Sequence, residues 1–326
     1  MYETTFHSKP LDEFSFLVTG GAGFIGSHLV EYLLKYGARK VRVLDNLLTG
    51  KNENVDRFST RPQYEFIRGD IRDLNDCIKA CDGINFVLHQ AALASVQRSM
   101  KDPITTHEIN ADGFLNMLIA ARDAQVGRLV YASSSSVYGD HPDLPKREDK
   151  TGNPLSPYAV SKKVNELYAH VFASSFGMQI IGLRYFNVFG PRQDPNGPYA
   201  AVIPAFIRDL QSGKPAIIYG DGRQTRDFTF IENAVQANIK SVFAENADAL
   251  NQVYNVACGE SFSLVQLFEM IATSVQSNLK PQFEPARKGD ILHSTADVSL
   301  AKRLIGYTPL IDLKTGLQIL ATKQLD

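Results

Sequence analysis

An α/β fold is what the sequence predicts, with a doubly wound parallel sheet followed by a smaller C-terminal α/β lobe. The first observation behind this prediction is that short apolar segments alternate with amphipathic segments across the first half of the chain, the order expected when helices cover both faces of a parallel sheet. The second observation is that each apolar segment ends in a small or polar cluster. Because ligands of such sheets bind beyond the carboxyl ends of the strands, these clusters are candidates for a site.

The elements of the first half follow from the same patterns. Apolar runs predict strands at residues 14–18, 41–44, 64–67, 85–88 and 129–132. After the first run, Ile25, Leu29 and Leu33 recur at helical spacing. Further helices are expected at residues 73–79, 111–124 and 158–176.

The composition of the chain changes after Arg184. Glycine and proline punctuate shorter segments at residues 190–191, 195–198, 220–222 and 289–290. We therefore predict a first domain at residues 1–186 and a second, smaller lobe at residues 187–326. The elements of the second lobe need not be contiguous, and a strand at residues 253–256 could return to the first sheet.

Composition and charge restrict the partners. The formal net charge of −1 argues against a nucleic-acid or anionic-membrane partner, since either would require a concentrated excess of Lys and Arg. The cysteines Cys77, Cys81 and Cys258 are too few for a disulfide framework and lack the second pair of a zinc site, so we expect reduced thiols and no metal. The chain contains no apolar run of signal-peptide or membrane-spanning length, which predicts a cytoplasmic protein.

A glycine-rich turn, Gly20-x-x-Gly23-x-x-Gly26, lies between the first predicted strand and the first predicted helix. Glycine lets the backbone approach a pyrophosphate, and the helix N-terminus supplies amide donors; by itself the motif could equally be a tight turn. Asp45 ends the second strand, 19 residues after Gly26, where a carboxylate hydrogen-bonds the ribose hydroxyls and repels a 2′-phosphate. The alternative for Asp45 is a helix cap or turn residue. The pattern predicts a Rossmann-like domain that binds NAD rather than NADP.

Tyr158 and Lys162 are four residues apart, and so lie on one face of the predicted helix. A tyrosine ionises at a pH of about 10, so a catalytic phenolate would need the neighbouring ammonium and the positive nicotinamide for stabilisation. Such pairs also occur by chance in helices. Here, however, serines at residues 133–136 directly follow a predicted strand, where their hydroxyls can point into a cleft, although serine runs are usually solvated loops.

Taken together, these motifs resemble the extended short-chain dehydrogenase/reductase family. The matching segments are residues 20–26, 45–46, 69–71, 89–92, 134–139, 158–162 and 183–187. The resemblance runs from about Phe14 to Leu310. Within the family the chain most resembles the UDP-hexose 4-epimerases, in particular the bacterial UDP-N-acetylglucosamine 4-epimerases, through residues 138–142, 192–197 and 199–204.

The resemblance implies a mechanism. Tyr158 would take the proton of the sugar 4-hydroxyl while C4 gives its hydride to NAD, and Lys162 would also hold the nicotinamide ribose. Ser134 would bridge Tyr158 and the sugar oxygen, with Ser135 and Ser136 in the same pocket. The 4-keto sugar would then turn and receive the hydride on its other face, leaving the C4 configuration inverted.

The resemblance also implies two sets of binding residues. The cofactor set comprises Gly20, Gly23, Phe24, Ile25, Gly26, Asp45, Asn46, Asp70, Ile71, Gln90, Ala91, Ala92, Asn110, Tyr158, Lys162 and Tyr185. The substrate set comprises Ser95, Ser134, Ser135, Ser136, Asn187, Ala200, Val202, Tyr219, Arg226, Arg287, Asp290 and Ser294. Within the substrate set, Arg226 and Arg287 would pair with the two phosphates of a UDP-sugar, and Asp290 would bind the uridine ribose.

Substrate choice depends on Ser294 in this interpretation. A bulky tyrosine at this position accompanies epimerases restricted to plain hexoses, whereas serine leaves room for an N-acetyl group and so favours UDP-N-acetylglucosamine. Residues 94–98 depart from close relatives, which more often have a glycine and a proline there, and this leaves UDP-glucose and UDP-hexuronates as alternative substrates.

Two further alternatives concern the reaction itself. A nucleotide-sugar dehydratase or decarboxylase would carry an acid before Val137, where this chain has only serines. A non-catalytic NAD-binding protein would be expected to lose Tyr158 or Lys162. The family commonly pairs two helices per subunit in a four-helix bundle, so we expect a homodimer through residues 111–124 and 158–176.

Overall fold

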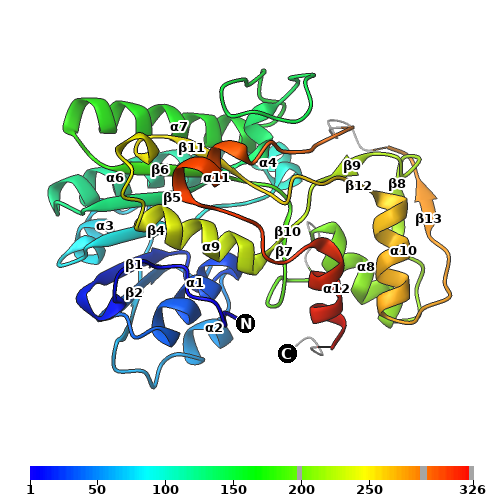
Figure 1. Ribbon diagram of the computed structural model, residues 1–326, viewed down its shortest axis with the longest axis horizontal. Helices are drawn as coiled ribbons and strands as arrows, with labels where there is room; N and C mark the ends of the chain where they lie inside the picture. The colour runs from blue at the N-terminus through cyan, green and yellow to red at the C-terminus, as the bar shows by residue number, and fades with distance from the viewer. Residues whose placement is uncertain (197–199, 287–291, 323–326) are drawn as a thin grey trace.

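A seven-stranded parallel sheet forms the centre of the larger lobe, in the order β11-β6-β5-β4-β1-β2-β3 (Figure 1). Its strands are β1 Ser15–Thr19, β2 Lys40–Asp45, β3 Tyr64–Arg68, β4 Phe86–His89, β5 Arg128–Ser134, β6 Ile180–Tyr185 and β11 Val253–Val256. The computed structural model describes residues 1–196, 200–286 and 292–322. The predicted α/β fold class is confirmed.

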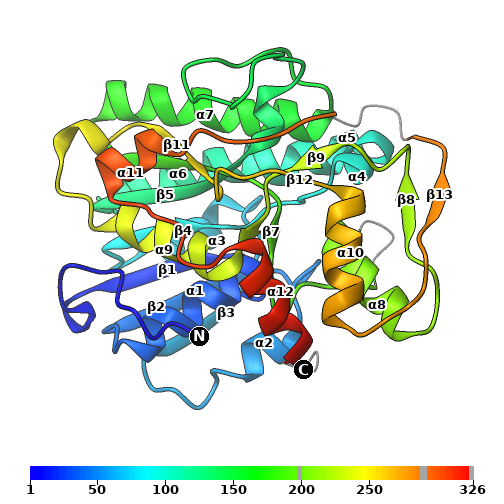
Figure 2. The same ribbon diagram turned by 45° about the vertical axis from the view of Figure 1, so that its right-hand side comes forward.

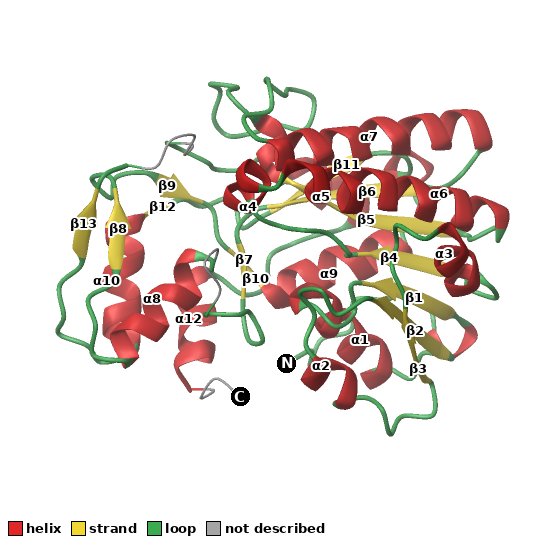
Figure 3. Ribbon diagram, turned by 180° about the vertical axis from the view of Figure 1, so that it is seen from behind, coloured by secondary structure: helices red, strands yellow, loops and turns green. Residues whose placement is uncertain are grey.

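Helices cover both faces of this sheet, as Figure 3 shows from behind. On one face lie α3 Leu74–Cys81, α6 Gly113–Asp123 and α7 Pro157–Phe176, and on the other lie α1 Phe24–Lys35 and α9 Ile231–Val242. Successive residues of a strand point to opposite faces of the sheet and so pack into the cores on its two sides. Leu17 packs with the α3–α6 side and Val18 with the α1–α9 side, which explains why residues 16–18 of β1 are all apolar.

The helix predicted at residues 111–124 is longer than its apolar pattern indicated. It begins at α5 Pro103–His107, passes through a π-helical turn at Glu108–Asp112 and continues as α6. Asp102 caps α5, accepting a hydrogen bond from the Thr105 amide at 3.1 Å. A short helix, α4 Val96–Lys101, precedes it, and α2 Asn52–Asp56 follows β2.

The smaller lobe is assembled from short pieces, at the right of Figure 2. Its helices are α8 Val202–Gln211, α10 Leu264–Ser274 and α12 Leu313–Thr322. Its strands form two-stranded sheets: β8 Ile217–Tyr219 with β13 Gln282–Glu284, β9 Thr225–Arg226 with β12 Phe262–Ser263, and β7 Val188–Phe189 with β10 Thr229–Phe230.

The chain crosses between the lobes more than once. After β7 and α8, it returns to the larger lobe as α9 and β11, and β11 pairs in parallel with β6 from Val253–Gly182 to Val256–Tyr185. It enters the smaller lobe again as α10, and α11 Ser299–Ile305 lies back beside β11. No helix within residues 1–196, 200–286 and 292–322 is both long and apolar enough to span a bilayer.

Candidate active site

The glycine turn brings the backbone of three segments into close contact. A Cβ on Gly20 would lie 2.7 Å from the Ala91 amide nitrogen, and one on Gly26 would lie 2.1 Å from the Gly20 carbonyl oxygen. Gly20 also has a φ of +69°, which glycine adopts without strain. The turn therefore requires glycine at both positions, and it leads directly into α1, whose N-terminal amides offer donors to an anion.

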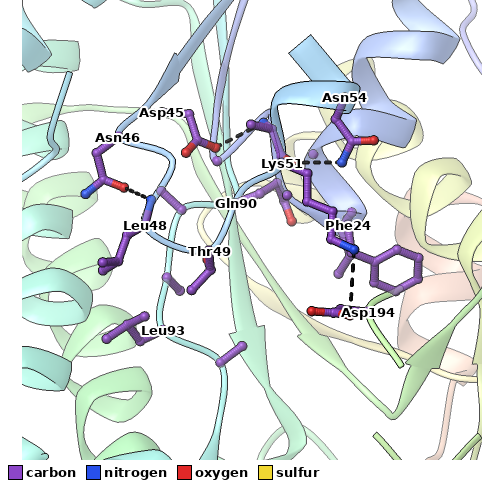
Figure 4. Close-up of a pocket in the computed structure, with 18 of the residues that line it drawn as sticks. Phe24, Asp45, Asn46, Leu48, Thr49, Lys51, Asn54, Gln90, Leu93 and Asp194 are labelled. Carbon is purple, nitrogen blue, oxygen red and sulfur yellow. Dashed lines mark hydrogen bonds and ion pairs between the residues drawn. The ribbon is translucent and has the colours of Figure 1, made fainter. Parts of the chain in front are cut away.

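A first pocket of about 390 Å³ opens at the carboxyl ends of β1, β2 and β4 (Figure 4). Its lining includes most of the predicted cofactor set, namely Gly20, Gly23, Phe24, Ile25, Gly26, Asp45, Asn46, Ile71, Gln90, Ala91 and Ala92. Ser95 and Ala200, from the predicted substrate set, also line it. The close backbone approach and the mixture of amides and apolar residues, with the Asp45 carboxylate at the end of β2, fit a dinucleotide.

Asp45 is the lining carboxylate that the sequence assigned to the ribose. One oxygen, Oδ2, accepts a hydrogen bond from the Ala22 amide at 3.0 Å, and Oδ1 accepts one from the Leu47 amide at 2.8 Å. Burial raises the pKa of Asp45, and the two amide donors act in the opposite direction. Since a carboxylate has about four acceptor sites, Asp45 retains capacity for ribose hydroxyls.

Asp70 lies one strand further along and supports Asn46. The side-chain nitrogen Nδ2 of Asn46 donates to Asp70 Oδ2 at 2.9 Å, and Arg72 pairs with the same oxygen at 2.7 Å. The hydrogen bonds from Arg72 lower the pKa of Asp70 to about 2. Asp70 is therefore a charged acceptor at neutral pH and fixes Asn46 at the pocket wall.

Asn110 and Tyr185 use their polar atoms inside the protein. Asn110 Oδ1 accepts from the Leu93 amide at 2.8 Å, and its Nδ2 donates to Ser161 Oγ at 3.1 Å. The Tyr185 hydroxyl donates to Gln90 Oε1 at 3.0 Å and accepts from Asn238 Nδ2 at 2.7 Å. These contacts fix the loops after β4, and a direct role for either side chain on the cofactor stays a prediction.

Tyr158 and Lys162 lie in the first turns of α7, which Ser156 caps through its hydroxyl. Lys162 is buried, its Nζ donates to the Ala132 carbonyl at 2.8 Å, and burial lowers its pKa to about 8. Burial raises the pKa of Tyr158, while a side-chain hydrogen bond with Ser134 lowers it. The predicted pair and the predicted serine are thus brought together.

Ser134 in turn accepts hydrogen bonds from the Ser136 amide at 3.2 Å and from the Ser136 hydroxyl at 3.0 Å. It caps the short 3₁₀ turn Ser135–Tyr138 at the end of β5. Ser135 and Ser136 are half-buried on this turn. The hydroxyls of the serine run are therefore held in an ordered turn and not in a solvated loop.

A second pocket, of about 410 Å³, lies on the smaller lobe. The predicted substrate residues in its lining are Asn187, Ala200, Val202, Tyr219 and Arg226. The two pockets share Ala200 and Ala201.

The serine–tyrosine pair lies at the carboxyl end of β5. Strand β5, which ends at Ser134, is paired with β4 on one side and β6 on the other. The residues after β4 line the first pocket, and Asn187, shortly after β6, lines the second. Neither Ser134 nor Tyr158 is among the residues that line the two pockets, so the strand order, and not the pocket lining, relates the pair to them.

Arg226 and Ser294 are joined through Thr225. Arg226 Nη1 donates to the Thr225 carbonyl at 2.9 Å, and the amide of the buried Ser294 donates to the same carbonyl at 3.1 Å. Arg287 and Asp290, also predicted to bind substrate, lie outside the described residues.

Sequence reasoning assigned no site role to Lys51, Arg98 and Arg192, although all three line the first pocket. Lys51 pairs with Asp194 at 3.6 Å across its mouth (Figure 4), and Arg192 contacts Glu31 on α1. The signal for Arg192 was its place in the motif at residues 192–197. Among the described residues, no cluster of His, Cys, Asp or Glu could hold a metal ion.

The fold and the first pocket define an enzyme of the short-chain dehydrogenase/reductase type. More narrowly, residues 16–257 match the NAD dependent epimerase/dehydratase family, and the chain belongs to that family. This relationship confirms the predicted class of enzyme and the NAD cofactor.

The chain resembles relatives with different substrates. A putative UDP-glucose 4-epimerase of Methanocaldococcus jannaschii is 38% identical over 93% of this chain and 95% of its own length. The solved UDP-N-acetylglucosamine 4-epimerase of Methanobrevibacter ruminantium, in complex with UDP-N-acetylmuramic acid, is 40% identical, covers 95% of this chain and 97% of its own, and has a TM-score of 0.89. The UDP-glucuronic acid 4-epimerase of Bacillus cereus, solved with NAD, is 32% identical over 94% and 98% of the two chains, with a TM-score of 0.88.

Proposed function

We propose that this chain is a UDP-N-acetylglucosamine 4-epimerase, which interconverts UDP-N-acetylglucosamine and UDP-N-acetylgalactosamine through a 4-keto sugar. The observation that carries the proposal is the Ser134–Tyr158 pair at the end of β5, since the neighbouring strand β4 leads into the dinucleotide-type pocket and β6 leads into the pocket that contains Arg226. Bound NAD supplies the reversible oxidation at C4. The chain's own residues must therefore move one proton and hold the sugar nucleotide.

Tyr158 is the proposed acid and base. As a phenolate it takes the proton of the 4-hydroxyl, and as a phenol it returns a proton to the reduced sugar. The Lys162 ammonium, buried on the same helix face, favours the phenolate by its charge. Ser134 stabilises that form by its hydrogen bond and is in position to contact the sugar oxygen, with Ser135 on the same turn.

The second pocket is proposed to hold the UDP group. Arg226 and Arg287 are the proposed cations for the diphosphate, and Asn187 and Tyr219 are proposed contacts to the nucleotide sugar. The proposed acetamido site is beside Ser294, which adjoins Arg226 through Thr225. The similar acetylglucosamine epimerase supports this choice, whereas UDP-glucose and UDP-hexuronates are the substrates to test against it.

A dehydratase reaction finds less support in the site. It needs a carboxyl group near the keto sugar, but the carboxylates that line the two pockets within the described residues are Asp45, Asp194 and Asp209. The segment before Val137, where a dehydratase would carry its acid, contains serines at residues 133–136. A non-catalytic NAD-binding protein would be expected to lose Tyr158 or Lys162, and both are present.

We also propose that residues 1–186 mainly bind NAD and residues 187–326 mainly bind the sugar nucleotide, in a cytoplasmic homodimer. In support of the dimer, α7 exposes Leu167 and Val171 to 58% and 49%, and α5 exposes Ile104 to 71%, an apolar surface of the kind that pairs helices between subunits. Light scattering at micromolar concentration should give twice the chain mass; a monomer would contradict the dimer alone.

The function is tested by incubating the purified protein with UDP-N-acetylglucosamine, without added NAD, and separating the sugar nucleotides for proton NMR. UDP-N-acetylgalactosamine is the expected product. The same assay with added NAD separates loss of cofactor from lack of activity. Turnover of UDP-glucose or UDP-glucuronate alone would replace the substrate, and no turnover of any of them would contradict the epimerase.

A further inference from the structure

Behind the serine–tyrosine pair lies a buried ion pair. Glu166 follows Lys162 by one further helical step of four residues on α7, on the face that carries Tyr158. Its two carboxylate oxygens accept hydrogen bonds from Arg184, Oε1 from Nε at 2.8 Å and Oε2 from Nη2 at 2.9 Å. The Glu166 side chain is 8% exposed and that of Arg184 is 3% exposed, so this bidentate pair is largely shielded from solvent.

The pair holds the strand immediately before Ser134. The Ser133 hydroxyl donates to Glu166 Oε1 at 2.7 Å. Because Ser133 and Ser134 are adjacent, this bond also fixes the backbone from which Ser134 reaches Tyr158.

The pair also holds the turn that follows. Arg184 Nη1 donates to the Tyr138 hydroxyl at 3.0 Å and to the Glu148 carbonyl at 3.1 Å, and the Tyr138 hydroxyl donates to Asn255 Oδ1 at 2.6 Å. Tyr138 is the last residue of the turn that begins after Ser134. The segment from Ser133 to Tyr138 is thus tied at both ends to the one Glu166–Arg184 pair.

We infer that Glu166 is a positioning residue for the epimerisation reaction: together with Arg184 it holds both ends of the Ser133–Tyr138 segment, and this sets the place of the Ser134 hydroxyl relative to Tyr158. This inference rests on the proposed role of Tyr158. It adds a carboxylate that touches neither substrate nor cofactor. Small displacements of catalytic groups are costly, since an error of about 1 Å can lower a rate by about 100-fold.

The test is steady-state kinetics of Glu166→Gln, with rates expressed per bound NAD. We expect kcat to fall by about 10- to 100-fold with KM nearly unchanged, because the second pocket is left intact. The hydrogen bond from Ser134 lowers the pKa of Tyr158, so its disturbance should move the rising limb of the kcat–pH profile to higher pH. A change that is merely structural would reduce the active fraction without moving this limb.

A second variant covers the case in which Glu166→Gln does not fold. Ser133→Ala deletes the Ser133–Glu166 bond and leaves the ion pair in place, so it should move kcat and the pH limb in the same direction by a smaller amount. The matched control is Glu65→Gln, which breaks the Arg42–Glu65 pair of 2.8 Å between β2 and β3, at the other edge of the sheet. That variant should keep both kcat and the pH limb.

Tyr158→Phe, assayed in parallel, distinguishes failure of the positioning role of Glu166 from failure of the proposed function. If the phenylalanine variant is inactive while Glu166→Gln or Ser133→Ala folds and keeps the normal kcat and pH limb, the positioning role is overturned and the proposed function stands. If the phenylalanine variant keeps full turnover, the role of Tyr158 and the inference both fail.

Discussion

The two pockets are built differently, although they share part of their lining. The first pocket lies at the ends of neighbouring strands of one long sheet, and its residues come largely from the short turns after β1, β2 and β4. The second pocket draws on segments from Asn187 to Leu264, joined by strands of two or three residues. The comparison indicates that the cofactor side is fixed by the fold itself, whereas the substrate side can be altered piece by piece.

Removing the proposed base should have the largest effect. Tyr158→Phe deletes the only hydroxyl proposed to exchange the proton, so kcat should fall by about 1,000-fold, while NAD content and UDP affinity stay normal. Turnover by NMR, NAD by absorbance and UDP affinity by calorimetry measure the three quantities. Loss of either binding activity would show that Tyr158 supports a pocket as well.

A change confined to the first pocket should lower NAD affinity without changing UDP affinity. Asp45→Ala removes the proposed acceptor for the ribose and its bonds to the Ala22 and Leu47 amides, so NAD affinity should fall by about 100-fold. UDP affinity should remain normal. Glu53→Gln on the neighbouring α2 removes an exposed carboxylate and is the control; unchanged NAD affinity in Asp45→Ala would contradict the ribose assignment.

The reciprocal change is Arg226→Ala in the second pocket. Loss of a half-buried cation opposite the diphosphate should raise the KM for the sugar nucleotide by about tenfold, with normal NAD content. Arg223 is nearby in sequence with an 89% exposed side chain, so Arg223→Ala should leave KM unchanged. Equal effects of the two substitutions would point to general charge and not to a specific contact.

A smaller change, beside Thr225 and Arg226, should alter only substrate preference. Ser294→Tyr adds bulk beside the proposed acetamido group, and should shift the ratio of kcat/KM for acetylated over plain UDP-sugars by about tenfold toward the plain sugar. Competition between UDP-N-acetylglucosamine and UDP-glucose in one tube measures the ratio. An unchanged ratio would remove Ser294 from the determinants of specificity.

The smallest effect concerns stability and involves Lys162. Its pKa is about 8 in the folded protein, below the value of 10.5 for a free lysine, because burial disfavours the charged form. Between pH 8 and 9 the folded chain therefore releases this proton while the unfolded chain keeps it, and the free energy of unfolding should rise by about 1 kcal/mol. Denaturant unfolding of the cofactor-free protein measures the rise, and Lys162→Met should lack this contribution.

The sequence predicts well those parts of the molecule that are determined by residues close together in the chain. Strands β1 to β5 were placed to within a few residues, because each contains a short, mainly apolar segment, interrupted by Arg42 in β2 and by Glu65 in β3. The glycine turn, Asp45 and the Tyr158–Lys162 pair were found because each depends on short spacing. The fold brings Ser134 to Tyr158, as the resemblance implied.

What was missed depends on contacts between distant segments. Asn238 reaches the Tyr185 hydroxyl from α9, and Lys51 meets Asp194 from the opposite lobe. No local pattern indicates either contact, because each partner is an ordinary polar residue in its own segment. The π-helical turn at Glu108–Asp112 was also missed, since its apolar spacing merges with that of α6.

The return of the chain to the first sheet limits how related genes can be recombined. β11 covers the outer edge of β6, and α9 shares a core with α1 beneath the sheet. A fragment ending at residue 186 would leave the edge of β6 unpaired and an apolar sheet face uncovered. A chimaera that exchanges substrate specificity must therefore keep α9 and β11 with their parental first half, so that only the flanking segments of the smaller lobe are exchangeable.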